Sequence, residues 1–201
     1  MRRLILLTLC VLTSAITFGQ TSFGVKAGLN VSNTKGFDSE AKPIVAQHMG
    51  AYANITVGKR LFFRPELLHT VKGYKFPKWN TYEEGRFVAH YLALPVLFGM
   101  RPTEDISILV GAEVGYLLNA KFHFADSTSS NLRHFNKVDF ALAMGAAYRF
   151  ASKLAVEFRY NHGFEDLLTV SYSDQSGNYT RKVGAHRAFQ LSLSYRLSKS
   201  L

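Results

Sequence analysis

The segment ISILVGAEVGYLLNAK, residues 106–121, alternates between two kinds of side chain. One set is apolar and consists of Ile108, Val110, Ala112, Val114, Tyr116 and Leu118. The other set mixes small, polar and charged side chains, and consists of Leu109, Gly111, Glu113, Gly115, Leu117 and Asn119. Because successive side chains of a β-strand point to opposite faces of a sheet, this segment predicts a strand with one apolar face and one mixed face.

The same pattern of period two recurs along the rest of the chain. It predicts eight strands, at residues 23–31, 48–57, 61–71, 88–100, 106–121, 138–150, 154–163 and 189–197. The connections alternate between short ones (58–60, 101–105 and 151–153) and long polar ones (32–47, 73–87, 122–137 and 164–185). Short turns at one end and long loops at the other are typical of outer-membrane barrels, whose short turns lie in the periplasm. We therefore predict an all-β fold, an eight-stranded antiparallel up-and-down transmembrane β-barrel.

Residues 1–20 have the layout of a secretory signal peptide. Arg2 and Arg3 provide a positive start, an apolar stretch follows, and small and polar residues end the segment. We expect cleavage after Gly19 or Gln20 and export to the outer membrane. The alternative is an N-terminal membrane anchor, for which the apolar stretch is short.

The remaining residues, 21–201, contain no linker and are expected to form one barrel domain. Hydrophobic residues make up 47% of the chain and the mean hydropathy is close to zero, so apolar and polar residues are well mixed. The formal net charge is +10, but Lys and Arg form no long run. Scattered basic residues fit contact with anionic lipid headgroups, including lipopolysaccharide, and no nucleic-acid partner is expected. The single cysteine, Cys10, lies in the leader, which excludes disulfides and cysteine metal sites from the mature domain.

The composition of the mixed face indicates which way the faces point. It carries charges of both signs and several glycines, which inside a narrow barrel make room for long side chains. We expect this face to line the interior, where charges must pair because an unpaired buried charge is costly. The predicted interior charge network consists of Lys26, Arg64, Glu66, Glu113, Asp139, Arg149, Glu157, Arg159 and Arg196. Side chains fill a barrel of eight strands, so no diffusion pore is expected.

Six segments carry a resemblance to a known family: FGVKAGLN (23–30), PELL (65–68), YLALPVL (91–97), GYLLNAK (115–121), EFRYNHG (157–163) and FQLSLSYRL (189–197). They resemble the PorT family of outer-membrane β-barrel proteins of Bacteroidetes. The resemblance implies a non-enzymatic role in the cell envelope, accessory to type IX protein secretion. It also implies secretion-system components and the barrel assembly machinery as partners. Two positions depart from the family: Ala93 replaces an acidic residue, and the last strand ends at Leu197 rather than at an aromatic residue.

Two other functions stay open at this point. A lipid-modifying enzyme of the outer membrane needs a nucleophile, a base and an orienting group. The candidates are His162, Glu165 and Asp166, followed by Ser171 or Ser173, although a polar loop base is the simpler interpretation. The second alternative is a periplasmic lipocalin-like barrel, which requires the apolar face to point inward.

We predict no catalytic, cofactor-binding or metal-binding residue. Glu113 with Glu157 or Asp139 forms a candidate pair for acid–base chemistry, but neutralisation of interior arginines explains these carboxylates better. The seven histidines form no close ligand pair. Weaker candidates lie in the long loops: a metal site at His123, Asp126 and His134, and a glycan or partner contact at Lys75, Lys78 and Trp79.

Overall fold

A computed structural model of the chain describes residues 21–34, 41–77, 84–124, 128–129, 136–164, 168–174, 177–183 and 186–197. The signal peptide predicted at residues 1–20 lies outside the described residues. The strands are β1 (Thr21–Thr34), β2 (Lys42–Thr56), β3 (Leu61–Phe76), β4 (Gly85–Met100), β5 (Ile106–Phe124), β6 (Thr128–Ser129), β7 (Val138–Arg149), β8 (Leu154–Gly163), β9 (Leu168–Asp174), β10 (Gly177–Val183) and β11 (His186–Arg196). No helix in the described part of the chain is long and apolar enough to cross a membrane.

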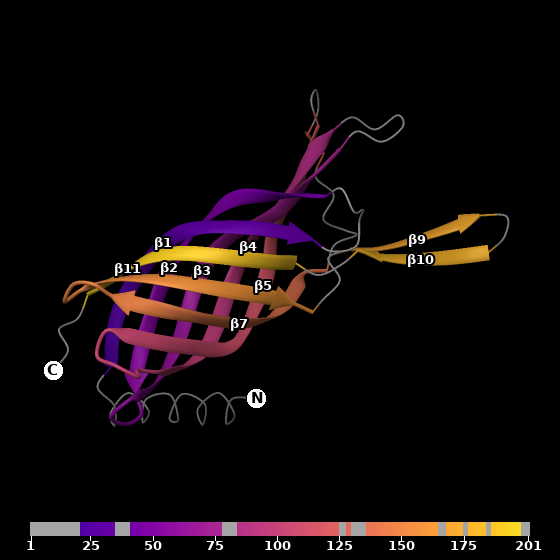
Figure 1. The fold of residues 1–201 in the computed structure, drawn as a ribbon. Helices are drawn as coiled ribbons and strands as arrows, with labels where there is room; N and C mark the ends of the chain where they lie inside the picture. Colours follow the sequence, from indigo (N-terminus) through magenta and orange to yellow (C-terminus); the bar gives the residue numbers. More distant parts are fainter. Residues whose placement is uncertain are drawn as a thin grey trace, which may run out of the picture.

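The predicted barrel is confirmed. The sheet has the order β4-β3-β2-β1-β11-β8-β7-β5-β6. The pairing of β4 with β5 closes its eight long strands into a barrel (Figure 1), and the short β6 pairs with the end of β5. Neighbouring strands are antiparallel throughout, as in the register Lys26↔Gly50 between β1 and β2 and Ala27↔Leu193 between β1 and β11. A closed sheet leaves no barrel strand with an unpaired edge, which is the condition for crossing a lipid bilayer with strands.

The predicted faces also match the structure. Large apolar side chains of every barrel strand are exposed on the outside, among them Phe98 at 66%, Leu191 at 55% and Leu94 at 50%. The mixed face is buried, and Glu66, Glu113 and Glu157 each expose 3% or less. A soluble binding barrel has the reverse arrangement, so the lipocalin-like alternative does not fit this fold.

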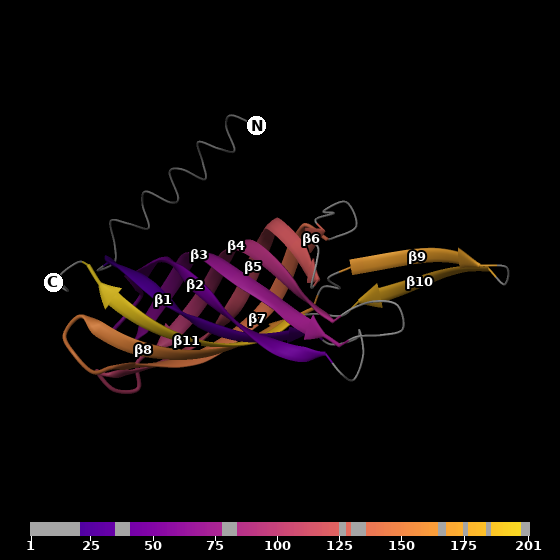
Figure 2. The same ribbon diagram turned by 90° about the horizontal axis from the view of Figure 1, so that it is seen from above.

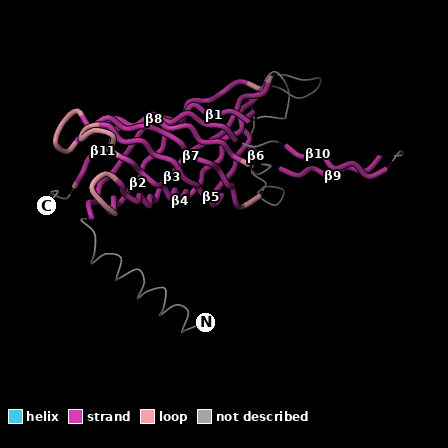
Figure 3. The backbone as a smooth tube through the Cα atoms, turned by 60° about the horizontal axis from the view of Figure 1, so that its bottom comes forward, coloured by secondary structure: helices cyan, strands magenta, loops and turns pink. Residues whose placement is uncertain are grey.

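Strands β1 to β5 and β11 extend further into the long connections than the alternation predicted, whereas β7 and β8 begin or end there as predicted. Figures 1 and 2 show β3, β4 and β5 continuing past the other barrel strands, at the end opposite the short turns. Their outermost register pairs are Phe76↔Gly85 and Gly85↔Phe124. The connection predicted as a loop at residues 164–185 contains a separate two-stranded sheet, β9 with β10, which projects from the same end (Figure 3).

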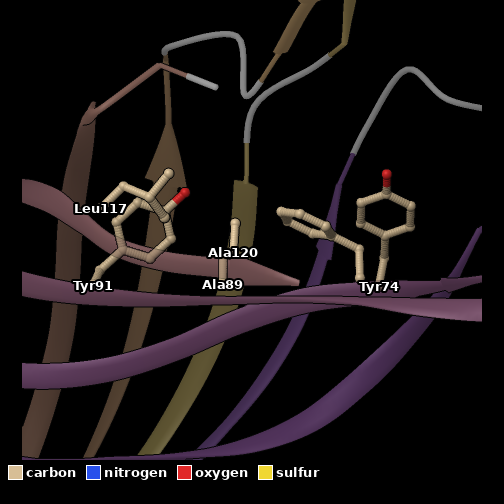
Figure 4. Packing of buried hydrophobic residues seen from close by; sticks show 6 residues of the cluster. Tyr74, Ala89, Tyr91, Leu117 and Ala120 are labelled. Carbon is tan, nitrogen blue, oxygen red and sulfur yellow. The ribbon is translucent and has the colours of Figure 1, made fainter. Parts of the chain in front are cut away.

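Two apolar clusters pack inside the barrel, one towards each end. The first cluster lies near the short turns and consists of Phe62, Leu97, Leu109, Ala143 and Ala147. The second cluster lies on the inner face of β3, β4 and β5 (Figure 4). It consists of Tyr74, Phe87, Ala89, Tyr91, Leu117 and Ala120. The charged side chains lie along the interior between and beside these clusters, as expected of an eight-stranded barrel, whose interior is only wide enough for its own side chains.

The glycines of the inner face have a wider role than the one predicted. At Gly99 an added Cβ would overlap the ring of Phe62, and at Gly24 that of Tyr52. At Gly111 it would overlap the carbonyl oxygen of Val96 and lie 2.8 Å from the Cα of Leu97, both on the neighbouring strand. These glycines therefore admit aromatic rings and close strand contact, rather than long charged side chains alone.

We expect Gly111→Ala to destabilise the barrel by about 1–3 kcal/mol, because the new methyl group meets backbone that cannot move without distorting β4. The matched control is Gly115→Ala on the same strand and the same face, where the nearest atoms to a new Cβ are at 3.4 and 3.5 Å. Denaturant unfolding in detergent micelles measures both variants. Equal stability of the two would contradict the assignment of Gly111 to a close strand contact.

Candidate functional site: the charged barrel interior

Glu157 is the centre of the first interior charge network. Its carboxylate accepts hydrogen bonds from Lys26 Nζ at 2.7 Å, Arg159 Nη2 at 2.6 Å and Arg64 Nη1 at 2.8 Å. Glu66 accepts two hydrogen bonds from Arg159, at 3.0 and 2.7 Å, and its nearer contact to Lys26 Nζ is 3.4 Å. These five side chains contribute three positive and two negative charges, and all are buried.

Lys72 is the centre of the second network. Its Nζ lies 3.0 Å from Glu113 Oε1 and 2.9 Å from Asp139 Oδ2. Asn161 donates a further hydrogen bond to Glu113 Oε2 at 2.9 Å. This network contributes one positive and two negative charges, so together the two networks are electrically neutral. Neutrality matters because charges removed from water are stable only when they are compensated.

The strands place these partners on different walls of the barrel. Glu66 belongs to β3 and Arg159 to β8, and in the sheet order these strands are separated by β2, β1 and β11. Their paired, two-pronged hydrogen bonds therefore cross the interior. Such bidentate arginine–carboxylate pairs are among the strongest ionic contacts in proteins. The arrangement closes the interior with side chains that hold one another in position.

Uncharged polar side chains complete the packing between the networks. Asn30 donates to Thr70 Oγ1 at 2.7 Å and to the carbonyl oxygen of Val71 at 3.1 Å. His48 Nε2 lies 2.7 Å from Ser192 Oγ. Each of these side chains comes from the inner face of a barrel strand, where the period of two placed it.

Arg149 and Arg196 lie apart from the two networks, unlike the other seven residues predicted for the interior. Arg149 donates to Asp105 Oδ1 at 3.3 Å and to the carbonyl oxygen of Glu104 at 2.6 Å. Arg196 donates to the carbonyl oxygen of Ser152 at 2.7 Å. Both arginines stand at the strand ends beside the short turns, so their side chains reach residues of these turns instead of the interior carboxylates.

A further arginine lies at this end of the barrel. The guanidinium carbon of Arg101 lies 4.4 Å from the centre of the Phe62 ring, within the range of a cation–π contact. Burial, with the neighbouring guanidinium groups of Arg64, Arg149 and Arg196, lowers the pKa of Arg101 below its ordinary value. Arg101, Arg149 and Arg196 thus lie together at the end of the barrel with the short turns, where Asp105 pairs with Arg149.

Lys72 is the network member that sequence analysis missed. The predicted strand ended at residue 71 and the polar connection was predicted from residue 73, so Lys72 was assigned to neither. The structure continues β3 to Phe76 and buries Lys72, which exposes 1%. The signal that would have found it is parity: Lys72 continues the inward series of Arg64, Glu66 and Thr70.

The weaker candidates for chemistry acquire no support from the geometry. Among the described residues no three His, Cys, Asp or Glu side chains form a group that could hold a metal ion. His162 Nδ1 lies 3.2 Å from the hydroxyl of Tyr160, on the outer face. Its proposed partners Glu165 and Asp166 lie outside the described residues, as do Asp126, His134, Lys78 and Trp79, and the side chains of Ser171 and Ser173 are not described either.

Comparison with known proteins agrees with this architecture. A family model described as "Outer membrane protein beta-barrel domain" matches residues 18–169. Neisserial surface protein A (NspA) is similar in structure, with a TM-score of 0.51, 13% sequence identity, and coverage of 88% of this chain and 97% of that one. The outer membrane protein OprG from Pseudomonas aeruginosa gives a TM-score of 0.51 at 12% identity, with coverage of 89% and 97%. At this identity the two structures show the fold alone. No curated protein sequence matches.

Proposed function

Because the chain belongs to the outer membrane protein β-barrel family, we propose that it acts without catalysis, as a structural or interaction protein of the outer membrane. The observation that carries this proposal is the closed interior. Ion pairs between β1, β3 and β8 cross it, and every carboxylate of the two networks already has a cationic partner. Carboxylates engaged in this way hold a structure together and have no open position for a substrate.

The orientation follows from the connections. The short turns after β2, β4 and β7 face the periplasm, as they do in outer-membrane barrels generally. The extended ends of β3, β4 and β5 and the β9–β10 sheet then face the outside of the cell. On this orientation a partner meets either the projecting outer strands or the periplasmic end of the barrel. Export through the leader at residues 1–20 and insertion by the barrel assembly machinery belong to the same proposal.

An accessory role in type IX protein secretion is the more specific form of the proposal. Its support is the resemblance of segments such as residues 23–30 and 189–197 to the PorT family. The contacts described inside the barrel do not bear on it. Deleting the gene should impair surface delivery of secreted cargo while the envelope stays intact. Normal delivery in the deletion strain would remove the secretion role and leave the envelope role. Altered lipid A in that strain would instead point to lipid-modifying chemistry.

We expect the wild-type barrel to form no large, stable conductance in planar lipid bilayers, because its own side chains fill the interior.

The same preparation should migrate differently on a denaturing gel with and without boiling, since a closed barrel resists detergent. A known porin added to the same bilayer serves as the positive control. Large steady currents from heat-modifiable protein would contradict the closed interior, and recovery in the soluble periplasmic fraction would contradict the membrane location.

A further inference from the structure

Three side chains with atoms that bind soft metal ions are neighbours on the outer face of β2, β3 and β4. Nδ1 of His90 lies 3.3 Å from Nε2 of His69, and the centres of the two rings are 5.4 Å apart. The register pairs His69 with Met49 of β2, and directly paired residues lie on the same face of a sheet. We call Met49, His69 and His90 the Met–His–His group.

Strand pairing brings the two histidines together across 21 positions of the chain. The register pairs His69 with Leu92, which makes His90, two residues before Leu92, its diagonal neighbour on the same face. The pairing of β4 with β5 shifts register between His90 and Tyr91, and such a bulge redirects side chains locally. The spacing of the histidines along the sequence therefore gave no sign of this pair.

The distance between the two ring nitrogens suits a metal ion that both rings share. For bonds of about 2.0 Å between nitrogen and metal, two ligand nitrogens lie about 3.3 Å apart at a tetrahedral angle and about 3.5 Å apart in a flat triangle. The observed separation of 3.3 Å falls in this range. Without a metal, one ring donates a hydrogen bond to the other. With a metal, the donor ring carries its proton on its other nitrogen, and a small rotation turns both rings towards the ion.

The third donor, the thioether sulfur of Met49, indicates which metal fits. Soft sulfur ligands select Cu(I), whereas imidazole alone also suits Zn(II), Cu(II) and Ni(II). The group contains no carboxylate, the ligand that magnesium and calcium prefer. Its three donors are all neutral, and a singly charged ion is easier to hold beside lipid than a doubly charged one, because the cost of removing an ion from water rises with its charge.

The group lies at a height that an ion can reach. On β3 and β4 the two histidines come directly after the exposed apolar side chains of Leu67 and Leu92. Both rings are half-buried, Met49 exposes 49%, and the next outward residue of β2 is the exposed Gln47. The Met–His–His group therefore stands at the edge of the apolar band, between lipid and water.

We propose that the Met–His–His group binds one copper(I) ion on the outer face of the barrel. His69 and His90 each provide an imidazole nitrogen and Met49 provides its sulfur. The copper arrives already reduced, so binding transfers no electron. The ion joins β2, β3 and β4 to one another and stabilises the folded barrel. With two histidines and a methionine, this set differs from the groups of three His, Cys, Asp or Glu side chains considered above, and it is separate from the interior networks.

The test measures copper(I) binding by the untagged protein, purified from outer membranes into detergent. The protein is titrated without oxygen against bicinchoninate, a chelator whose copper(I) complex is coloured. His69→Gln and His90→Gln each remove one ring of the group. The matched control, His162→Gln, removes a half-buried histidine of the outer face whose Nδ1 contacts the hydroxyl of Tyr160 rather than a second imidazole. The shift on a denaturing gel with and without boiling checks that every variant is folded.

We expect the wild type to take one copper(I) ion per chain from the chelator. His69→Gln and His90→Gln should each weaken binding by about 100-fold or more, since losing a residue that only orients a metal ligand already costs roughly 10–100-fold. Met49→Leu should weaken the binding of copper(I) and leave that of zinc(II) unchanged, because zinc relies on the imidazoles. Copper(I) should also raise the unfolding temperature of the wild type and of His162→Gln, as a ligand of the native state does.

Three results would overturn this inference. The wild type could leave all the copper with the chelator, or His162→Gln could lose as much affinity as His90→Gln. Equal copper(I) affinity of Met49→Leu and the wild type would remove the sulfur ligand, and with it the choice of copper(I). The gel shift reports the folded barrel independently of copper, so failure of the metal site is distinct from failure of the proposed membrane role.

Discussion

Glu157→Gln should lower the free energy of unfolding by about 3–5 kcal/mol, because removing one partner of a buried ionic network leaves the others uncompensated. Glu157 accepts hydrogen bonds from three cations, and Glu66 alone would then remain beside Lys26, Arg64 and Arg159. The glutamine side chain keeps the volume of the glutamate, so no cavity contributes to the change. Guanidinium unfolding of refolded protein in detergent micelles measures the effect.

The control for this variant is Asp105→Asn, which also removes a carboxylate that contacts an arginine. The contact between Asp105 and Arg149 is 3.3 Å long, and 57% of the Asp105 side chain and 33% of the Arg149 side chain are exposed. Exposed ion pairs contribute about 0–1 kcal/mol, so this variant should stay close to the wild type. Similar losses in the two variants would show that the interior network has no special weight in the stability of the barrel.

Lys72→Met should also lower the free energy of unfolding by about 3–5 kcal/mol, in this case because a buried cation is lost and its carboxylate partners are left uncompensated. Lys72 provides the ammonium group shared by Glu113 and Asp139, and the substitution leaves two buried carboxylates facing a thioether. Methionine is an unbranched side chain of similar length, which keeps the packing against Tyr91 largely intact. The loss should appear as a lower denaturant midpoint with an unchanged slope, as expected for a change in stability alone.

A neutral version of the same network separates charge from packing. Lys72→Met combined with Glu113→Gln and Asp139→Asn removes all three charges together, and should recover most of the stability lost in Lys72→Met. The new amide oxygen at position 113 can still accept the hydrogen bond from Asn161. A triple variant less stable than Lys72→Met would show that the individual hydrogen bonds, rather than charge compensation, hold this part of the interior.

The alternation of side chains was sufficient to predict the barrel strands, but not where the strands end. A lipid-facing side and a packed interior impose the period of two directly on the sequence, so Leu94 or Glu113 could be placed on a face with no structure. Where the strands extend beyond the membrane, the outer face no longer meets lipid, so the sequence there need not alternate between apolar and polar side chains. Two irregularities in register, between Pro43 and His48 and between His90 and Tyr91, also shift the phase of the outer strand ends.

The β9–β10 sheet shows the same limit. Its strands lie in a connection that was predicted as a polar loop, at residues 164–185, because no apolar face is required of a hairpin that projects from the barrel. The register there pairs Tyr172 with Tyr179 and Leu168 with Val183. Backbone pairing of this kind is set by turn geometry, and composition alone does not distinguish it from an irregular loop.

The sequence by itself determined the fold class, the direction of the two faces and all but one of the residues that carry the interior charges. These properties follow from repeating local constraints, which each strand satisfies separately. Only the tertiary structure decided which charges meet. It brought Glu157 to Lys26, drew Lys72 into the interior, left Arg149 and Arg196 at the rim, and brought His69 to His90. Such contacts depend on strand register and barrel closure, which bring together residues that are far apart in the chain. A local pattern of side chains does not specify which of these residues meet.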